Sequence, residues 1–528
     1  MIKQNPFILS FISGLLLWLS WPHYGFAPLI FIAWIPLLLA EQKISSSEKK
    51  KKGLRVFGLS FLTFFIWNTS TTWWIWNATP GGAVMAILWT SLLMSLTFLC
   101  YHRTKKRMGE KWGWAILICY WLTYELIQTH WDLSWTWLAL GNVFAKNYDW
   151  VQWYEYTGTF GGGLWILVVN FLILSLKNNL EKRKLKNNFS ILLLIVFPII
   201  ISKIIAFLHT PNSDNDYANI VVVQPNIDPY NEKFAGDYAG QLNKMLDLAE
   251  QKLDSNTDYL LFPETALQEN IWENDLEETY SIVEIRKFLK KYPKLKIITG
   301  ASSAKSYETV EPPNSTARKF SNDFGYYDKF NTAFQIDKSE KIQIYHKSIL
   351  VPGVEKMPFP KILGFLEDYA LDLGGTSGSL AGQKERSVFV SPDAKIKIAP
   401  IICYESVYGE YVAEYVKNGA QLLFIITNDG WWGNSAGYHQ HMMYASLRAI
   451  ETRRCIARSA NTGISCFIDE EGHITDVTEW WKAAVIKKSL IMNNEETFYV
   501  RHGDYIARVS VFFTIVLVAF SFYKRFKK

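Results

Sequence analysis

The sequence predicts a chain with two kinds of domain: a polytopic α-helical membrane domain and a layered α/β domain outside the membrane. The first observation is a series of long apolar segments, seven within residues 1–208 and one close to the C-terminus. The second is that Lys and Arg gather in alternate connections between those segments. The third is that residues 209–505 alternate short β-type runs with amphipathic helical patterns, which predicts a sheet structure covered by helices.

The composition supports a membrane protein. Of the 528 residues, 49% are hydrophobic and 16% are aromatic, with 22 Trp. This content is high for a soluble protein and typical of one with belts of Trp and Tyr at the membrane interfaces. The length is sufficient for two domains that each have their own core. We expect an N-terminal transmembrane domain at 1–208, an extracytoplasmic domain at 209–505, and a last transmembrane helix with a basic tail at 506–528.

Eight segments are predicted to span the membrane. Several hold fewer than the roughly 20 apolar residues of an ideal span, so their ends are approximate. The first segment follows Lys3 as the core of a signal peptide would, but no small-residue cleavage site follows it, so a retained helix is predicted. The limits are 6–21, 26–40, 54–76, 82–102, 112–129, 161–176, 190–208 and 506–523.

The charges of the connections predict the orientation of the chain. The loops at 22–25, 77–81 and 130–160 contain Lys146 as their only Lys or Arg. Cytoplasmic loops are enriched in these residues, so both termini and the basic connections are predicted to be cytoplasmic, with residues 209–505 on the opposite side. A nucleic-acid-binding surface does not explain this alternation. The basic residues are Lys43, Lys49, Lys50, Lys51, Lys52, Arg55, Arg103, Lys105, Lys106, Arg107, Lys111, Lys177, Lys182, Arg183, Lys184, Lys186, Lys524, Arg525, Lys527 and Lys528.

The five cysteines do not form a disulfide or zinc pattern. Cys100 and Cys119 lie in predicted spans, whereas Cys403, Cys455 and Cys466 lie in the extracytoplasmic domain. There is no C-x-x-C pair and no zinc-type spacing. We expect Cys455 and Cys466 to be small buried core residues. A free thiol on an extracytoplasmic face needs a reason, and catalysis by Cys403 is one.

Several segments of the 209–505 domain have clear predicted structure. The polar segment 304–331 is expected to be an exposed excursion. The apolar segment 357–373 is either a lid that lies on the membrane or an amphipathic helix packed on the domain. Strands are predicted at 219–224, 259–262, 296–300, 333–336, 342–345, 396–402, 422–427 and 457–469, and helices at about 236–253 and 438–454.

Three residues with complementary chemistry each follow a predicted strand: Glu264, Lys347 and Cys403. A cysteine at a strand-to-helix turn is close to backbone N–H groups that can hold an oxyanion. A buried glutamate has its pKa raised by desolvation and can act as a general base. A lysine lowers the pKa of a neighbouring thiol. Singly, a turn glutamate, a surface lysine and a core cysteine are commoner, so the set of three carries the prediction.

The surrounding motifs extend this pattern. Tyr345–Glu355, Ile402–Glu405 and Thr427–Gly433, followed by Tyr438–His441, Arg448–Glu451 and Arg458–Gly463, resemble the carbon–nitrogen hydrolase (nitrilase) superfamily, whose Glu-Lys-Cys triad occurs in this order. In the membrane part, Pro22–Ala40 and Trp135–Gly161 resemble the apolipoprotein N-acyltransferase family. The resemblance implies a protein of the bacterial inner membrane. Its nitrilase-like αββα sandwich is expected to lie on the periplasmic side. It implies transfer of an acyl chain from a phospholipid to the N-terminal diacylglyceryl-cysteine of a lipoprotein.

The resemblance also assigns residues. It makes Glu264, Lys347 and Cys403 the catalytic triad, and it matches further required positions to the supporting residues Glu355, Tyr404 and Glu405. Phe234 stands near a position where the family has a functional Trp, so it is either an aromatic substitute or a loop anchor. Trp431 and Trp432 form either a wall of the acyl pocket or part of the core.

No metal, cofactor or nucleic acid is expected to bind. His439 and His441 are spaced i, i+2, whereas helical zinc ligands are usually spaced i, i+4, so a structural role is predicted.

Two other functions remain open on the sequence. A membrane-tethered nitrilase-type amidase would use the same triad, but it would need no bilayer substrate and no anchor of eight spans. A non-catalytic partner module would be expected to have lost part of the triad. The sequence therefore favours an acyltransferase with a ping-pong thioester mechanism.

Overall fold

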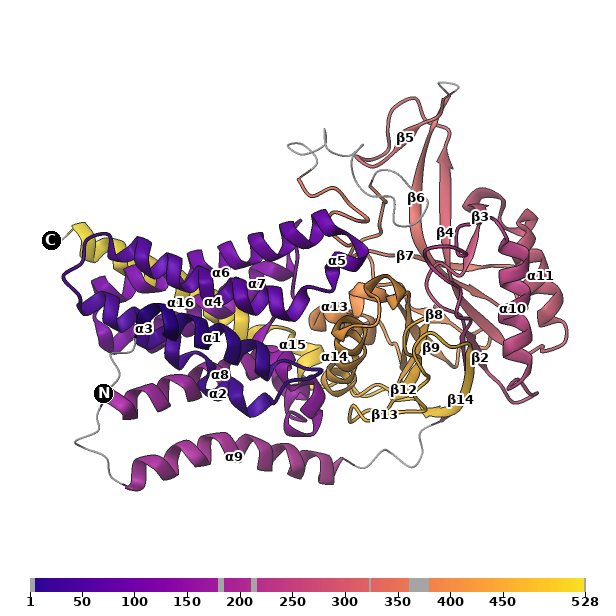
Figure 1. Cartoon of the computed structure of the whole chain (residues 1–528). Helices are drawn as coiled ribbons and strands as arrows, with labels where there is room; N and C mark the ends of the chain where they lie inside the picture. Colours follow the sequence, from indigo (N-terminus) through magenta and orange to yellow (C-terminus); the bar gives the residue numbers. More distant parts are fainter. Residues whose placement is uncertain (1–4, 179–184, 210–215, 322–323, 360–378, 527–528) are drawn as a thin grey trace. The chain divides into compact units, whose positions relative to one another are not determined.

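The computed structural model describes residues 5–178, 185–209, 216–321, 324–359 and 379–526. The chain forms two compact units. The first comprises Met1–Trp76, Pro80–His209 and His502–Lys528, and the second comprises Asn77–Thr79 and Thr210–Arg501. The elements of both are labelled in Figure 1.

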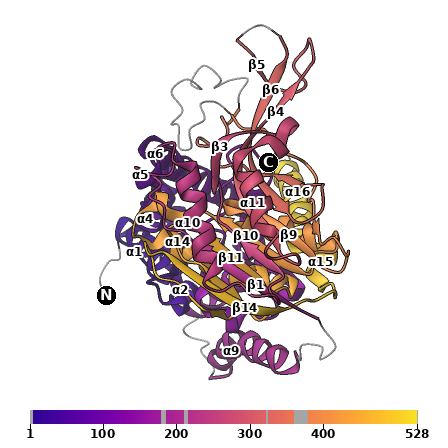
Figure 2. The same ribbon diagram turned by 90° about the vertical axis from the view of Figure 1, so that its right-hand side faces the viewer.

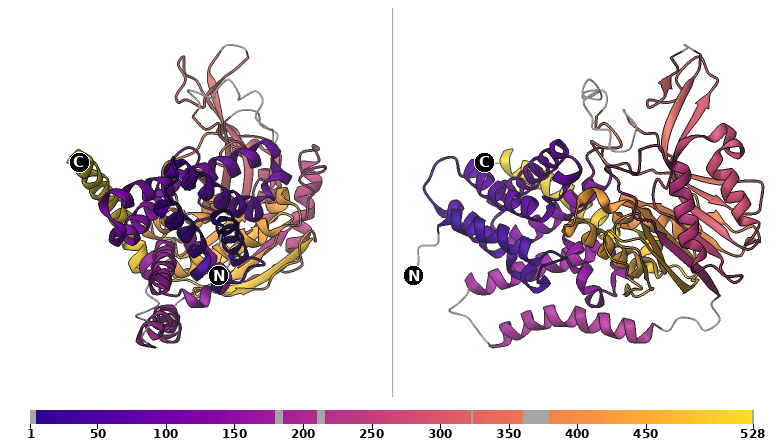
Figure 3. Two further views of the ribbon diagram at one scale, coloured as in Figure 1. Left: turned by 60° about the vertical axis from the view of Figure 1, so that its left-hand side comes forward. Right: turned by 45° about the vertical axis from the view of Figure 1, so that its right-hand side comes forward.

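The first unit is entirely helical. The C-terminal helix α16 packs against α6 and α7, which lie far from it in the sequence (Figure 3). Short 3₁₀ helices occupy Ala27–Leu29, Glu110–Trp112 and Leu140–Trp150. The α-helices are α1 (Pro6–Ser20), α2 (Ile30–Ala33), α3 (Ile35–Ser46), α4 (Lys52–Thr72), α5 (Ile75–Ala78), α6 (Pro80–Met108), α7 (Gly113–Thr129), α8 (Tyr154–Asn178), α9 (Leu185–Leu208) and α16 (Tyr505–Phe526).

All eight predicted membrane segments fall on helices, but the described residues support five of them as spans. Helix α1 has 15 residues and α7 has 17, and α4 carries several Ser, Thr and Asn residues, so these three are too short or too polar to qualify. The number eight therefore stays a prediction. The five helices long and apolar enough to cross a membrane are Ala27–Ser46, Pro80–Met108, Tyr154–Ser175, Ile191–Leu208 and Tyr505–Phe526.

A buried asparagine supports the interrupted helix of the second segment. Pro36 has no backbone N–H, and the chain there is divided between α2 and α3. Asn170 of α8 accepts a hydrogen bond from the backbone of Trp34 (3.0 Å) and donates one to the backbone of Ile30 (2.8 Å). These bonds satisfy backbone groups that a lipid environment cannot.

The second unit contains two sheets in contact. The first sheet has the order β14-β1-β2-β4-β6-β5, with β3 paired to β4 and β7 to β6, and the second has the order β13-β12-β11-β10-β9-β8. The strands of the first are β1 (Tyr217–Gln224), β2 (Tyr259–Leu261), β3 (Leu267–Trp272), β4 (Lys296–Tyr307), β5 (Arg318–Lys319), β6 (Tyr326–Ile336), β7 (Gln343–His346) and β14 (Ala484–Ile491). Those of the second are β8 (Phe389–Val390), β9 (Lys397–Ile402), β10 (Leu422–Thr427), β11 (Ile456–Ala460), β12 (Cys466–Ile468) and β13 (Ile474–Thr475).

Helices cover the outer face of each sheet (Figure 2). Helices α10 (Tyr238–Glu250) and α11 (Tyr280–Leu289) bury an apolar stripe against β1, β2 and β4. Helices α13 (Gly409–Lys417) and α14 (Ala436–Thr452) pack on the second sheet, and the short α15 (Phe498–His502) follows β14. Between the sheets the rings of Tyr259 and Phe424 meet edge to face. The predicted αββα sandwich is therefore present.

Three local predictions need correction or restriction. The predicted strand 457–469 is two antiparallel strands, because Asn461, Thr462 and Gly463 form a turn that lets Arg458 of β11 pair with Cys466 of β12. Part of the 304–331 excursion is a β-ribbon, since β4 and β6 remain paired as far as Tyr307 and Tyr326. Most of the 357–373 segment lies outside the described residues.

Candidate active site

Glu264 follows β2, at the carboxyl end of the parallel strands β1, β2 and β4. Strand β4 passes close to it because Gly300 has no side chain. A Cβ at Gly300 would lie 2.6 Å from the Glu264 Cα and 2.4 Å from the backbone nitrogen of Thr265. Thr265 itself has a left-handed backbone with φ +46°. The sequence thus fixes Glu264 in a tight, strained turn, and its side chain is buried.

Four buried or half-buried side chains form what we call the carboxylate–lysine cluster: Glu264, Asn331, Lys347 and Glu355. Lys347, which is 1% exposed, donates to Oε1 of Glu264 (3.1 Å) and to Oε1 of Glu355 (2.8 Å). Asn331 of β6 donates its amide to the same two oxygens at 2.8 and 2.9 Å. One lysine and one amide therefore hold both carboxylates together.

Cys403 is the first residue after β9 and begins a 3₁₀ helix over Cys403–Val407. The helix expected after the strand of Cys403 is only this short 3₁₀ turn, and α13 starts later, at Gly409. Cys403 has a left-handed backbone (φ +50°), which is costly for a residue with a Cβ. Such a turn is typical of nucleophiles presented at the end of a strand.

A buried charge network lies beneath Cys403. His441 of α14 is 3.1 Å from the Cys403 carbonyl oxygen through Nε2, and its Nδ1 is 3.0 Å from Asp429. Arg458 of β11 pairs with the other oxygen of Asp429. Burial opposes ionisation of Asp429, but Arg458 and His441 hold its pKa well below the usual range. His441 therefore has a structural partner on each ring nitrogen.

Glu405 joins the loop of the lysine to the strand of the cysteine. Its carboxylate accepts hydrogen bonds from the backbone of Ile402 (2.9 Å) and Ser348 (2.7 Å) and from the hydroxyls of Tyr345 (2.7 Å) and Tyr411 (2.6 Å). Tyr404 is buried, with its ring edge to face with that of Tyr408. The resemblance gave Glu405 a supporting role, and these contacts favour one in holding the lysine loop against the cysteine strand.

The charges differ from those expected for isolated residues. Burial and the Glu264 carboxylate raise the pKa of the Cys403 thiol, and they outweigh the lowering by Lys347 that the sequence suggested. Burial alone would raise the pKa of Glu264, but Lys347, Asn331 and Lys233 together lower it, so the expected raised value is wrong. Burial opposes the charge of Lys347, yet Glu264 and Glu355 raise its pKa. The resting site is a neutral thiol beside an ionised carboxylate and a protonated lysine.

Sequence reasoning missed Lys233 and Asn331. Lys233 is buried, and its Nζ donates to the backbone carbonyl of Glu264 (3.0 Å). Desolvation lowers its pKa to about 8, against the opposing charges of Glu264 and Cys403. Asn331 lies within a strand and Lys233 within a loop. Neither directly follows a predicted strand, as Glu264, Lys347 and Cys403 do. A lysine directly before the candidate Phe234 was the only available hint.

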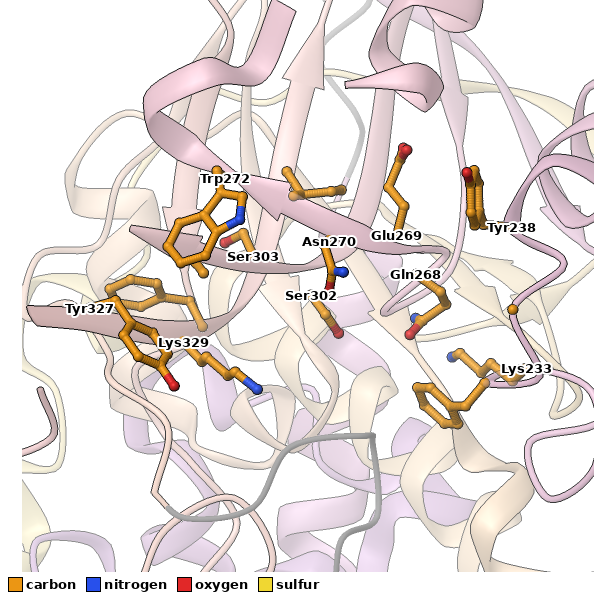
Figure 4. Close-up of a pocket in the computed structure, with 15 residues that line it drawn as sticks. Lys233, Tyr238, Gln268, Glu269, Asn270, Trp272, Ser302, Ser303, Tyr327 and Lys329 are labelled. Carbon is orange, nitrogen blue, oxygen red and sulfur yellow. The ribbon is translucent and has the colours of Figure 1, made fainter. Parts of the chain in front are cut away.

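The three candidate aromatic residues lie near Lys233 and His441. Phe234 is 38% exposed and stacks on Trp431 with ring centroids 6.3 Å apart. The ring of Trp432 meets His441 edge to face. Phe234 and Lys233 also line a cavity of about 410 Å³, together with residues of β3, β4 and β6 (Figure 4). Among the described residues, no group of three or more His, Cys, Asp and Glu side chains is arranged to hold a metal ion.

Comparison with known proteins extends these observations. The model of the apolipoprotein N-acyltransferase N-terminal domain matches residues 13–172, and the carbon-nitrogen hydrolase model matches residues 219–494. Apolipoprotein N-acyltransferases from Chlorobaculum tepidum, Geobacter metallireducens and Thermotoga maritima are 29%, 25% and 26% identical, covering 96%, 99% and 97% of this chain and 95%, 96% and 93% of theirs. The crystal structure of Saccharomyces cerevisiae Nit3, of the nitrilase superfamily, aligns with a TM-score of 0.38 and 14% identity over 52% of this chain and 90% of its own.

The fold of the second unit and the match over residues 219–494 define a carbon–nitrogen hydrolase domain. Together with the N-terminal match and the relatives that span nearly the whole chain, they show that the chain belongs to the apolipoprotein N-acyltransferase family and is an acyltransferase. The family, the nitrilase-like fold and the class of enzyme are thus confirmed.

Proposed function

We propose that this enzyme moves a fatty acyl chain from a membrane phospholipid to the N-terminal amine of the diacylglyceryl-cysteine of a lipoprotein, through a thioester on Cys403. The relatives are named for apolipoprotein N-acylation, which supports the acceptor and a lipid donor. The observation that carries the mechanism is the arrangement of charges: a neutral thiol on a strained turn, with ionised Glu264 and protonated Lys347 as its electrostatic partners.

In the first step, Glu264 takes the proton of the Cys403 thiol, and the thiolate attacks an ester carbonyl of the phospholipid. The oxyanion is stabilised by the Lys347 ammonium and by the backbone N–H of Tyr404. The tetrahedral intermediate then expels the glycerol oxygen, which Glu264 protonates. The products are a lysophospholipid and an acyl-thioester on Cys403. The strained backbone of Cys403 and the buried network below it fix the position of the sulfur for both steps.

In the second step, the free amine of the lipid-modified cysteine attacks the thioester. Glu264 accepts a proton from the amine, the carbon–sulfur bond breaks, and the thiolate is reprotonated. An amide replaces a thioester, which makes the transfer energetically favourable. Exclusion of water from this buried site prevents loss of the acyl group by hydrolysis.

The same proposal includes a setting for the reaction. We place the enzyme in the bacterial inner membrane with eight spans, both termini in the cytoplasm, and the 209–505 domain in the periplasm. The alternation of basic connections supports this orientation. Glu355 serves to orient Lys347, because both lie within one hydrogen-bonded cluster.

Intact mass spectrometry tests the proposal. The purified enzyme is incubated with phospholipid, and a fatty-acyl mass increment is expected on Cys403 that disappears when a diacylglyceryl-peptide is added. Cys403→Ala should show no increment. Cys455→Ala is the matched control, because Cys455 is also buried in the second unit and should leave acylation intact. A wild-type enzyme that never carries an acyl group would instead favour an amidase or a non-catalytic partner module.

A further inference from the structure

The cavity of about 410 Å³ beside the carboxylate–lysine cluster has no part in the two steps above. We call it the β3–β6 groove. Figure 4 shows Gln268, Asn270 and Trp272 of β3 on one side of it, Tyr327 and Lys329 of β6 at one end, and Lys233 at the other. All of these residues belong to the second unit.

The groove borders the carboxylate–lysine cluster through its lining residues Lys233 and Lys329. Alternate residues of a strand lie on one face, so Asn331, Lys329 and Tyr327 share one face of β6. Asn331 bonds the carboxylates of Glu264 and Glu355, and the same face then continues into the groove. At the opposite end, Lys233 both lines the groove and bonds the backbone of Glu264. A molecule in the groove therefore lies next to the residues that hold the general base.

The lining does not suit an acyl chain. Amide and hydroxyl side chains of Gln268, Asn270 and Ser302 face the groove, together with the aromatic rings of Trp272 and Tyr327. The Gln268 amide already donates to the Thr265 carbonyl oxygen, but hydrocarbon in the groove would offer no hydrogen-bond partner to Asn270 and Ser302, which costs free energy. Amides and hydroxyls satisfy a peptide backbone, and aromatic rings pack against peptide side chains, so this surface suits a short peptide.

The length and the charge of the groove agree with a peptide. From Gln268 to Trp272, which both line the groove, β3 advances about 13 Å, which is the reach of about four extended residues. A lipid head group of one phosphate and a small alcohol is shorter. Of the charged lining residues, Glu269 accepts a hydrogen bond from the backbone of Ser281 (2.8 Å) and points away from the groove, whereas Lys233 and Lys329 line it. Lys233 donates to the Glu264 carbonyl oxygen, and both lysines add positive potential. This favours polar or acidic residues over basic ones.

We propose that the β3–β6 groove binds the first residues of the acceptor peptide that follow its lipid-modified cysteine. The inference rests on the proposed function, because only the second substrate of that reaction carries a peptide. In this arrangement the groove aligns the acceptor amine with the thioester. The first step, which uses phospholipid alone, does not depend on it.

The test separates the two steps. Acyl-enzyme is isolated and mixed with a diacylglyceryl-cysteine that carries four further residues, or with the amide of diacylglyceryl-cysteine alone. The wild-type enzyme should use the peptide at least ten-fold better in kcat/KM. Asn270→Ala, Tyr327→Ala and Lys329→Met should reduce that preference, chiefly through KM, while phospholipid acylates Cys403 at an unchanged rate. Lys305→Met is the matched control, an exposed lysine on the same ribbon outside the groove.

Two results would overturn the inference. One is equal use of the peptide and the bare amide by the wild-type enzyme. The other is a groove variant that changes the first step according to the phospholipid head group, which would assign the groove to the donor. If the wild-type enzyme forms no acyl-enzyme, the proposed function fails instead. In that case the groove is tested alone, by binding of a fluorescent diacylglyceryl-peptide to the Cys403→Ala protein. Equal affinity with and without the groove substitutions would overturn the inference.

Discussion

Both units bury a glutamate beside a lysine, and the two clusters have different consequences. In the first unit Glu41 of α3 pairs with Lys105 of α6, lies 2.6 Å from His102, and accepts a hydrogen bond from Ser45. In the second unit Glu264 pairs with Lys347, and both act electrostatically on the thiol of Cys403. The partners of the first carboxylate come from α6 and from its own helix, whereas the second cluster gathers residues from the interior of β6 and from the connections after β2 and β7, beside Cys403.

The comparison shows that a buried ion pair is not by itself evidence of catalysis. Burying charges costs free energy that the pair and its hydrogen bonds must offset, and structural pairs do this as well as catalytic ones. What distinguishes the second cluster is the strain at its edges, with Thr265 and Cys403 both in left-handed backbone conformations. A cavity does not distinguish the two, because Lys105 of the first cluster also lines one, of about 570 Å³.

The largest expected effect distinguishes the two buried glutamates. Glu264→Gln removes the general base, so acyl-enzyme formation should fall about a thousand-fold. Glu41→Gln is the matched change in the first unit. It removes the negative charge that pairs with Lys105, so it should lower the free energy of unfolding by about 3 kcal/mol while acylation persists. Single-turnover acylation by intact mass and thermal unfolding in detergent measure the two effects. Normal acylation by Glu264→Gln would make the two clusters equivalent and would contradict the mechanism.

The next effect tests the strained turn. Gly300→Ala places a Cβ against the backbone of Glu264 and Thr265, which must then shift. Displacing the Glu264 carboxylate by about 1 Å is expected to slow acylation about a hundred-fold, although no chemical group is removed. Gly58→Ala is the control, since a Cβ there meets nothing within 4 Å. If Gly300→Ala acylates as fast as Gly58→Ala, the close approach of β4 has no role in placing Glu264.

The third prediction concerns pH. Glu264 must be ionised to act as a base, so the rate of acylation is full above its folded pKa and is lost as the pH falls through that value. Lys347, Asn331 and Lys233 hold this pKa below the ordinary value. Lys233→Met removes one of the positive charges, so the acid limb of the rate profile should move to higher pH. Lys244 is an exposed lysine on α10, and Lys244→Met should leave the acid limb in place. If Lys233→Met does not move the acid limb either, Lys233 does not lower the pKa of Glu264.

The smallest effect is expected at Phe234. Its ring is partly exposed and stacks on Trp431, so a larger aromatic ring can be accommodated there. Phe234→Trp should keep acylation within about two-fold, because the stacked area is kept. Phe234→Ala exposes Trp431. It should raise the KM for phospholipid more than it lowers the maximal rate of acylation. Rates measured over a range of phospholipid concentrations separate the two, and a large loss in Phe234→Trp would mean that this position demands its exact shape.

The sequence was sufficient for the parts of the site that follow local rules. Glu264, Lys347 and Cys403 each follow a β-type run in the sequence, and the structure brings the first two into direct contact. The alternation of β-type and helical segments was likewise sufficient for the layered fold. The same rule failed at 457–469, where one predicted strand is two strands joined by the connection 461–465.

The remainder depends on contacts between distant residues. Asn331 lies inside a strand and becomes significant only because β6 crosses beside Glu264 and Glu355. The lowered pKa of Glu264 results from three partners that the chain brings together from residues 233, 331 and 347. The resemblance gives Glu405 only a supporting role, whereas the structure surrounds its carboxylate with four donors from β7, the loop after it, β9 and α13. Such roles follow from tertiary structure and have no local signature.

The central claim is that Cys403 carries the acyl group between donor and acceptor. The most direct measurement is a chase of isolated acyl-enzyme, freed of phospholipid and mixed with diacylglyceryl-peptide, in which loss of the acyl mass from Cys403 and gain by the peptide amine are followed together. The account predicts equal amounts and equal rates for the loss and the gain. Acyl-enzyme that persists while the peptide is acylated only when phospholipid is added back would contradict it.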